Sequence, residues 1–152
     1  MSMEYRKYTP KDIFVSYLGR EATEEEIAEG YEPGQRVYNK KTGVEVFDIF
    51  TEMVHTHMNH YPEFYAEKFG VKSHEMAGYI KVMSGLYAKQ WIDKYVYLVV
   101  SELLYETDMP MGEVAKATGF SSVASFSRSF IKRAGMPATE WRRKAREKMK
   151  RR

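Results

Sequence analysis

The sequence predicts an all-α fold with two helix-turn-helix subdomains joined by a long central helix, about seven helices in all, and a small N-terminal appendage. Three observations support this prediction. Apolar residues recur with the 3.6-residue period of a helix from residue 44 almost to the C-terminus. Glycines stand where short turns must end one helix before the next begins. A helix–glycine–helix pattern occurs over residues 61–83 and again over residues 110–134.

Residues 1–43 are expected to form an appendage of short helices and loops. Residues 10–18 have apolar side chains on one side of a short amphipathic helix that would end at Gly19. Thr23 followed by Glu26 is the signature of a capping box, which predicts a second short helix.

Four helices are expected before the second subdomain. The first covers residues 44–58, and its apolar stripe consists of Val46, Phe47, Phe50, Met53, Val54 and His57. Residues 61–84 are predicted to be the first helix-turn-helix, with helices over 61–69 and 72–83. A linker helix follows over residues 87–105 and is long enough to hold the two subdomains at a fixed separation.

The second helix-turn-helix subdomain is predicted over residues 110–134. The buried stripe of its first helix consists of Met111, Val114, Ala115 and Thr118. Gly119 stands where the turn needs a positive φ. Ser121 or Ser122 can cap the second helix, because a hydroxyl accepts from the free N–H groups of the first turn. The side chains of the second helix expected to face the core are Val123, Phe126 and Phe130.

The opposite face of this second helix is small, polar and cationic. Spacings of three and four residues place on it Ser121, Ala124, Ser125, Arg128 and Lys132. A helix that enters the major groove of DNA needs small side chains for close approach and an arginine for base edges or phosphate. The alternative interpretation is a helical hairpin with a solvated face.

The C-terminal third of the chain is strongly basic. A last helix is expected over residues 139–150, with Trp141 turned inward. Its arginines expected to face outward are Arg142, Arg143 and Arg146. Residues 110–152 contain 12 Lys and Arg against 3 Asp and Glu, a net charge of +9, whereas residues 1–109 contain 12 against 18, a net charge of −6. Beside a helix-turn-helix, this charge favours nucleic acid as the partner over a solvated basic tail.

Composition disfavours several other classes of protein. No apolar run approaches the roughly 18–20 residues of a membrane span, and the N-terminus lacks the apolar segment of a signal peptide. The chain has no cysteine, which removes thiolate chemistry and fits a reducing cytoplasm. There is no glycine-rich phosphate loop and no recognisable catalytic pair of carboxylates. We therefore expect no enzyme activity and no cofactor.

Three of the four histidines are close in sequence, which raises the question of a metal site. His57 and His60 could share one helix face, but His55 and His57 are two residues apart and would point in different directions. With no cysteine to support them, these histidines are expected to lie on the surface or half-buried, and no metal site is predicted.

The second half of the chain resembles the DNA-binding domain of the AraC/XylS family of bacterial transcriptional regulators. The residues that carry this resemblance are Leu103-Leu104-x-x-Thr107, Val114-Ala115-x-x-x-Gly119-Phe120, Ser125-Phe126-Ser127-Arg128-x-Phe130-x-Lys132, Gly135 and Thr139-Glu140-Trp141-Arg142. The resemblance extends over about residues 46–148 and leaves the appendage outside.

The resemblance implies that one recognition helix from each subdomain enters adjacent major-groove segments of bent DNA. Arg128 would contact a base or a phosphate, and Ala124 and Ser125 would lie against base edges. Ser122 and the N-terminal end of its helix, beside Ser121, would hold a phosphate. The backbone contacts would come from Lys132, Arg142 and Arg143.

The first subdomain has different residues at the corresponding positions. Gly78 stands where the family usually has an arginine, and Glu75 lies nearby. The candidate DNA contacts of this subdomain are Lys72, Ser73, His74, Ala77 and Lys81. This helix either reads bases or docks mainly through the DNA backbone and shape, and the sequence leaves both options open.

The predicted function is that of a sequence-specific regulator of transcription that binds double-stranded DNA. An activator in the bacterial cytoplasm is expected from the resemblance, as a monomer rather than a homodimer. RNA polymerase or another protein is a candidate partner of the appendage. The alternative is a protein-interaction module of AraC-like fold with weak or non-specific DNA binding, which Gly78 and the acidic residues 1–109 favour.

Overall fold

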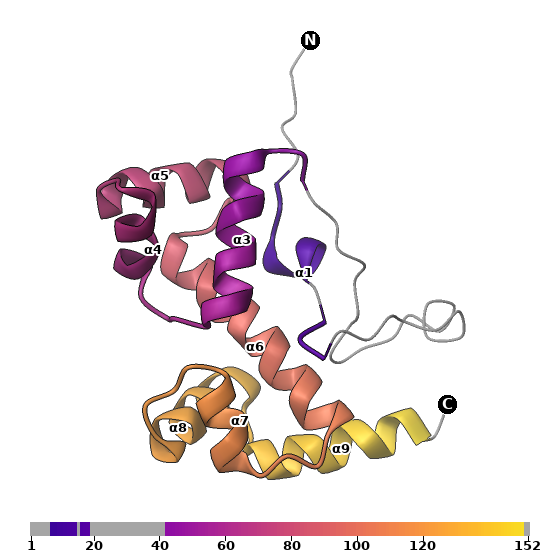
Figure 1. The fold of residues 1–152 in the computed structure, drawn as a ribbon. Helices are drawn as coiled ribbons and strands as arrows, with labels where there is room; N and C mark the ends of the chain where they lie inside the picture. The colour runs from indigo at the N-terminus through magenta and orange to yellow at the C-terminus, as the bar shows by residue number, and fades with distance from the viewer. Residues whose placement is uncertain (1–6, 15, 19–41, 151–152) are drawn as a thin grey trace. The chain divides into compact units, whose positions relative to one another are not determined.

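The computed structural model describes residues 7–14, 16–18 and 42–150. Within these residues the fold is all-α, as predicted, with eight helices and no strand (Figure 1). The chain divides into two compact units. Unit 1 contains the described residues up to 14 and those from 42 to 96, and unit 2 contains residues 16–18 and those from 97 to 150. No described helix is long and apolar enough to cross a membrane.

The described helices of unit 1 are the short α1 (Pro10–Ile13), then α3 (Glu45–His57), α4 (Pro62–Phe69), α5 (Ser73–Ser84) and the beginning of α6 (Ala88–Glu106). The helices α3 and α4 pack together, as do α4 and α5 (Figure 1). The largest buried side chains of this unit are aromatic: Phe14, Phe47, Phe50, Tyr65, Trp91 and Tyr95. Aromatic rings supply much of the buried apolar area of so small a core.

Unit 2 repeats this plan with α7 (Met111–Ala117), α8 (Val123–Ala134) and α9 (Ala138–Lys150) around the second part of α6. The helix α8 packs against both α7 and α9. Its buried side chains are Phe126 and Phe130, and the ring centroid of Phe130 lies 5.9 Å from that of Trp141. This burial fixes which face of α8 is left open to solvent.

The helix bounds agree closely with the sequence-based expectations. Each helix predicted with explicit bounds from residue 44 onward begins and ends within one residue of those bounds. Single side chains agree less well. In the stripe predicted for α3, Phe47, Phe50 and Val54 are buried, but Val46 is 51% exposed and His57 is also exposed. Val46 and His57 therefore lie at the margins of the buried stripe and not within it, and the exposure of His57 agrees with the surface position expected for the histidines.

The helix predicted over residues 10–18 is shorter than expected. The helix α1 has only four residues, Pro10–Ile13, and Phe14 leaves the helical conformation with a ψ of 132°. Phe14 is 1% exposed, and its ring centroid lies 5.6 Å from that of Tyr95. This tertiary contact favours an extended backbone at Phe14 where the local apolar pattern would continue a helix. The second short helix, predicted from Thr23 and Glu26, lies outside the described residues.

The described N-terminal residues are bonded to the helices that follow. In unit 2, the buried carboxylate of Glu102 accepts hydrogen bonds from the Ser16 hydroxyl and, over 2.8 Å, from the Tyr17 N–H. In unit 1, the Tyr8 N–H donates to the Met83 carbonyl over 2.9 Å. The described residues of the predicted appendage are thus packed within the two units.

Candidate nucleic-acid interface

The turn between α7 and α8 sets the direction in which α8 leaves. Gly119 has a φ of 81°. The Phe120 N–H donates to the Ala115 carbonyl over 3.0 Å, and the Gly119 N–H donates to the Lys116 carbonyl over 3.3 Å. These two bonds are those of a Schellman motif, which needs a left-handed residue at the position of Gly119. The role predicted for Gly119 is confirmed.

A serine hydroxyl caps the N-terminus of α8. The N-cap residue is Ser122, and its Oγ accepts a hydrogen bond from the Ser125 N–H over 3.0 Å. The sequence left the choice between Ser121 and Ser122 open, and the structure identifies Ser122. The first turn of α8 contains no acidic residue, so its positive dipole end is not neutralised by a side chain of that turn.

The face of α8 opposite its buried phenylalanines is small, polar and cationic, as expected. The exposed members of the predicted set are Ser121, Ser122, Ala124, Arg128 and Lys132, and Ser125 is half-buried. Because Phe126 and Phe130 are 1% and 3% exposed, α8 is firmly anchored. Its open face therefore has both the residue types and the accessibility that a recognition helix needs.

Val123 does not face the core, and that prediction was wrong. It is the first residue of α8 and is 46% exposed. It lies near Gly112 of α7, where an added Cβ would be 3.6 Å from the Val123 Cγ2 atom. A residue at the first position of a helix extends beyond the buried stripe, so the helical period alone places it incorrectly.

The helix α5 occupies in unit 1 the place that α8 occupies in unit 2, but its exposed side chains are different. Its N-cap residue, Lys72, makes no side-chain capping bond, and Glu75 lies in its first turn. The predicted contacts Lys72, Ser73, His74 and Lys81 are exposed, whereas Ala77 is half-buried. The Lys81 ammonium donates to the Gly85 carbonyl over 2.9 Å and lies 4.4 Å from the ring centroid of Tyr87.

Gly78 lies on the exposed side of α5, in helical conformation. A Cβ added at this position would have no neighbour within 4 Å. The glycine therefore serves no close approach of the kind that would require it. Its effect is to leave the middle of α5 without a side chain.

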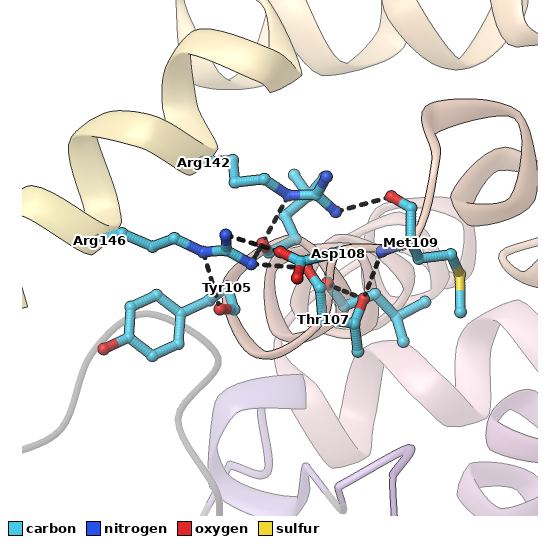
Figure 2. Close-up of polar contacts among 8 residues, drawn as sticks. Tyr105, Thr107, Asp108, Met109, Arg142 and Arg146 are labelled. Carbon is cyan, nitrogen blue, oxygen red and sulfur yellow. Dashed lines mark hydrogen bonds and ion pairs between the residues drawn. The ribbon is translucent and has the colours of Figure 1, made fainter.

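Two arginines of α9 hold the C-terminal end of α6 (Figure 2). The Arg142 Nε donates to the Leu104 carbonyl over 2.7 Å, and one of its terminal nitrogens donates to the Met109 carbonyl over 2.9 Å. Arg146 donates to the Thr107 carbonyl over 2.6 Å and pairs with Asp108 over 2.9 Å. Both guanidiniums satisfy carbonyls that a helix end leaves free, at the negative end of its dipole.

The prediction that Arg142 and Arg146 point outward was therefore wrong. Both residues are half-buried. Burial, followed by the nearby positive charge of Arg146, lowers the pKa of Arg142. By contrast, the side chain of Arg143 is 59% exposed and pairs with Glu147 one turn along the same helix over 3.0 Å. Of the two predicted contacts on α9, Arg143 remains accessible and Arg142 is engaged within the protein.

Comparison with known proteins identifies the family. A model of the helix-turn-helix domain family matches residues 65–144, which is more than half of the chain. The chain belongs to the AraC-type helix-turn-helix family. A search of curated proteins found no match.

Two solved structures resemble this AraC-type chain. The C-terminal domain of AraT, a response regulator from Geobacillus stearothermophilus, is 25% identical with a TM-score of 0.57, over 61% of this chain and 79% of that one. The C-terminal domain of the two-component response regulator yesN from Fusobacterium nucleatum is 17% identical with a TM-score of 0.60, over 64% of this chain and 98% of that one. At 17% identity the second likeness shows the fold alone.

The AraC-type family is one of non-enzymatic DNA-binding domains. Two of the histidines have aromatic side chains as neighbours. His55 Nδ1 lies 2.7 Å from the Tyr95 hydroxyl, and the His57 ring centroid lies 5.2 Å from that of Phe64. No three His, Asp or Glu residues within the described part of the chain are grouped so that they could hold a metal ion.

Sequence reasoning missed the structural task of Arg142 and Arg146 in this AraC-type domain. Their spacing of four residues puts them on one face of α9. That spacing is a usable signal, because two arginines on one face can reach a helix end together. What the spacing does not reveal is that the loop between α6 and α7 lies opposite that face.

Proposed function

We propose that this AraC-type domain is a sequence-specific regulator of transcription that inserts α5 and α8 into adjacent major-groove segments of double-stranded DNA. Membership of the family makes the chain a DNA-binding domain of a transcriptional regulator. We propose in addition that it recognises a specific sequence, that it uses both helices, and that it regulates transcription from the site it binds.

The observation that carries the proposal is the open face of α8. It combines an exposed arginine, Arg128, with small neighbours such as Ala124 and with the capped N-terminus at Ser122. Arginine at this position can donate two hydrogen bonds to guanine O6 and N7. The small side chains let the helix approach the base edges closely, so that such bonds can form.

We assign the contacts of unit 2 as follows. Arg128 reads a base edge, with Ala124 and Ser125 against neighbouring edges. Ser121, Ser122 and the free N–H groups at the start of α8 bind a phosphate. Lys132 and Arg143 contact the DNA backbone. The task of Arg142 is to hold α9 on the end of α6, since its guanidinium already donates to two carbonyls.

We propose that unit 1 docks mainly through the DNA backbone and shape. Gly78 leaves the centre of the α5 face empty, and Glu75 would repel a phosphate placed beside it. Contacts with the backbone would then come from Lys72, Ser73, His74, Ala77 and Lys81. Indirect readout of this kind gives preference for DNA deformability without base-specific hydrogen bonds.

We further propose that the protein activates transcription and acts as a monomer, with residues 44–152 as the DNA-binding domain. The basis for activation is the family resemblance. An activator must contact RNA polymerase or another protein, and we place that contact in residues 1–43, which lie outside the family match. Transcription from a promoter bearing the selected site, with and without the protein, tests this part.

Selection of the purified full chain on a random duplex library at physiological salt tests the central proposal. A two-part motif with about 10 bp between its centres is expected if both helices read bases. A single short motif is expected if α8 reads and α5 only docks, which is the outcome we propose. The absence of any enriched motif would overturn sequence specificity.

The dependence of binding on salt separates this function from its alternative, a protein-interaction module with non-specific affinity for DNA. Phosphate contacts release counterions, so the logarithm of the binding constant falls linearly with the logarithm of salt concentration. A specific regulator keeps a preference for its own site over random DNA at each salt concentration. Binding that is abolished by modest salt, with no such preference, would favour the interaction module.

A further inference from the structure

An exposed valine at the start of the recognition helix has no task in the function described so far. Val123 is 46% exposed and directly follows the N-cap residue Ser122. A residue that a protein core does not need, on the end of the helix expected to enter DNA first, is in a position to touch bases.

The backbone of α7 at Gly112 comes near one side of Val123, because a Cβ added to Gly112 would lie 3.6 Å from Val123 Cγ2. The β-branched side chain also has few accessible rotamers on a helix. The rotamer of Val123 is therefore restricted while nearly half of its surface stays open.

We propose that Val123 is a specificity-determining residue that reads the C5-methyl group of a thymine in the major groove. The methyl group is the one apolar feature that a base pair presents in that groove, and apolar side chains are the groups that recognise it. Val123 cannot donate or accept a hydrogen bond, so thymine is the base with which it is chemically matched. This inference rests on the proposed function, because it assumes that α8 reads DNA.

The position of Val123 on α8 distinguishes it from Ile131, a second large apolar residue that is exposed on that helix. Ile131 is exposed to a similar extent, 45%, but lies eight residues further along α8. At 1.5 Å per residue this is about 12 Å along the helix axis. Recognition helices contact base edges with their N-terminal residues. Ile131 is therefore a matched control of similar exposure and chemistry that lies too far along α8 to read the same base.

The experiment removes the methyl group from the DNA and the side chain from the protein. Each thymine of the selected site is replaced singly by deoxyuridine, which lacks only the C5-methyl group. The Kd of every duplex is measured with the wild-type full chain, Val123→Ala and Ile131→Ala. Burial of one methyl group corresponds to a change of about three- to fivefold in affinity.

The expected result is a loss of about three- to fivefold at one thymine position for wild type and for Ile131→Ala, but no loss at that position for Val123→Ala. Circular dichroism and thermal unfolding should show that Val123→Ala folds normally, since the site is exposed and alanine favours helix. A selected motif without such a thymine, or an equal loss in Val123→Ala, would overturn this inference while leaving sequence-specific binding intact. Absence of any motif would instead overturn the proposed function, and this inference with it.

Discussion

The two helix-turn-helix units share a backbone frame. In unit 1, Gly70 has a φ of 69°, and the Val71 N–H donates to the Ala66 carbonyl over 3.0 Å. In unit 2, Gly119 and Phe120 take the same parts with a φ of 81° and a bond of 3.0 Å. Each second helix also ends at a left-handed glycine with a φ of 78°. The turns that orient α5 and α8 therefore share one geometry, a left-handed glycine followed by a residue whose N–H donates back to the preceding helix.

The exposed faces of these two helices differ far more than their frames. The face of α8 has Arg128 and a capping hydroxyl from Ser122, with no acidic residue in the first turn. The face of α5 has Glu75 in its first turn and Gly78 at its centre. A shared frame therefore fixes how a helix is presented, while a few side chains decide whether it can read bases. The following predictions test that contrast, beginning with the largest effect.

The first prediction tests whether every basic residue of unit 2 contacts DNA or whether some, such as Arg142, stabilise the fold instead. Arg142→Ala leaves the Leu104 and Met109 carbonyls without their arginine donor. Hydrogen bonds from charged donors contribute about 1.5–3 kcal/mol, and we expect a loss of that size in the free energy of unfolding. Urea unfolding followed by circular dichroism measures it.

Arg143→Ala is the matched control for Arg142→Ala. Arg143 is exposed and pairs with Glu147 at the surface, and such pairs contribute about 0–1 kcal/mol. We expect little change in stability and a salt dependence of DNA binding that is shallower by about one phosphate contact. Equal stabilities of the two variants would contradict the structural task assigned to Arg142.

Arg128→Ala should remove most of the base reading by α8. We expect specific binding to weaken by about 1–3 kcal/mol, with relaxed preference at one base pair, because a bidentate contact to guanine is lost. Binding to variants of the selected site at every base pair provides the measurement.

Lys132→Ala serves as the control, since Lys132 is an exposed cation one turn further along α8. Loss of a phosphate contact weakens binding to all sequences alike. If Arg128→Ala also weakened all sequences uniformly, Arg128 would be a backbone contact and α8 would read bases without it.

The frame was readily predicted from the sequence, because its determinants are local. A helix ends where a glycine can adopt a positive φ, as at Gly119, and begins where a hydroxyl can cap it, as at Ser122. The apolar period then places anchors such as Phe126 and Phe130. These signals depend on residues close together in the sequence, so they can be recognised without knowledge of the tertiary fold.

The errors arose where a partner distant in sequence decides the outcome. Arg142 turns inward because the end of α6 offers carbonyl groups about 38 positions earlier in the chain. The helix α1 ends early because Phe14 packs against Tyr95. Val123 has the period of a core residue, but the core does not extend to the first position of α8. None of these partners can be identified from local spacing alone.

Gly78→Arg should make unit 1 more like unit 2. The added side chain meets no neighbouring atom at its Cβ within 4 Å, and it places a cation at the centre of α5. We expect tighter DNA binding and a slope of log K against log salt that is steeper by about 0.9, as for one added phosphate contact. Affinities over a range of salt concentrations measure this.

Gly78→Ala separates the charge from the backbone effect. Alanine in place of an exposed helical glycine should stabilise the fold by about 0.5–1 kcal/mol, without a change in the salt slope. If Gly78→Arg steepened the slope no more than Gly78→Ala does, α5 would not lie near the DNA backbone, and two-helix docking would have to be abandoned.

The smallest expected difference between the units is in how their stability depends on pH. All four histidines lie within residues 55–74, in unit 1. His55 Nδ1 lies 2.7 Å from the Tyr95 hydroxyl. Burial lowers the pKa of His55 below 6.5, and the charge of Glu52 opposes this shift to a smaller extent. The unfolded chain therefore binds more protons at this residue than the folded chain does as the pH falls through 6.5.

We expect the free energy of unfolding to be lower at pH 5.5 than at pH 7.5, since His55 must be protonated against its burial. The part due to His55 should be below about 1 kcal/mol, because the half-buried ring is screened by solvent. Urea unfolding in a Trp141→Phe background, followed through the fluorescence of Trp91 in unit 1, measures this difference. His55→Gln, which keeps a polar group toward Tyr95, should reduce the difference. An unchanged pH dependence in His55→Gln would assign the loss of stability in acid to other groups, and His55 would then not distinguish unit 1 from unit 2.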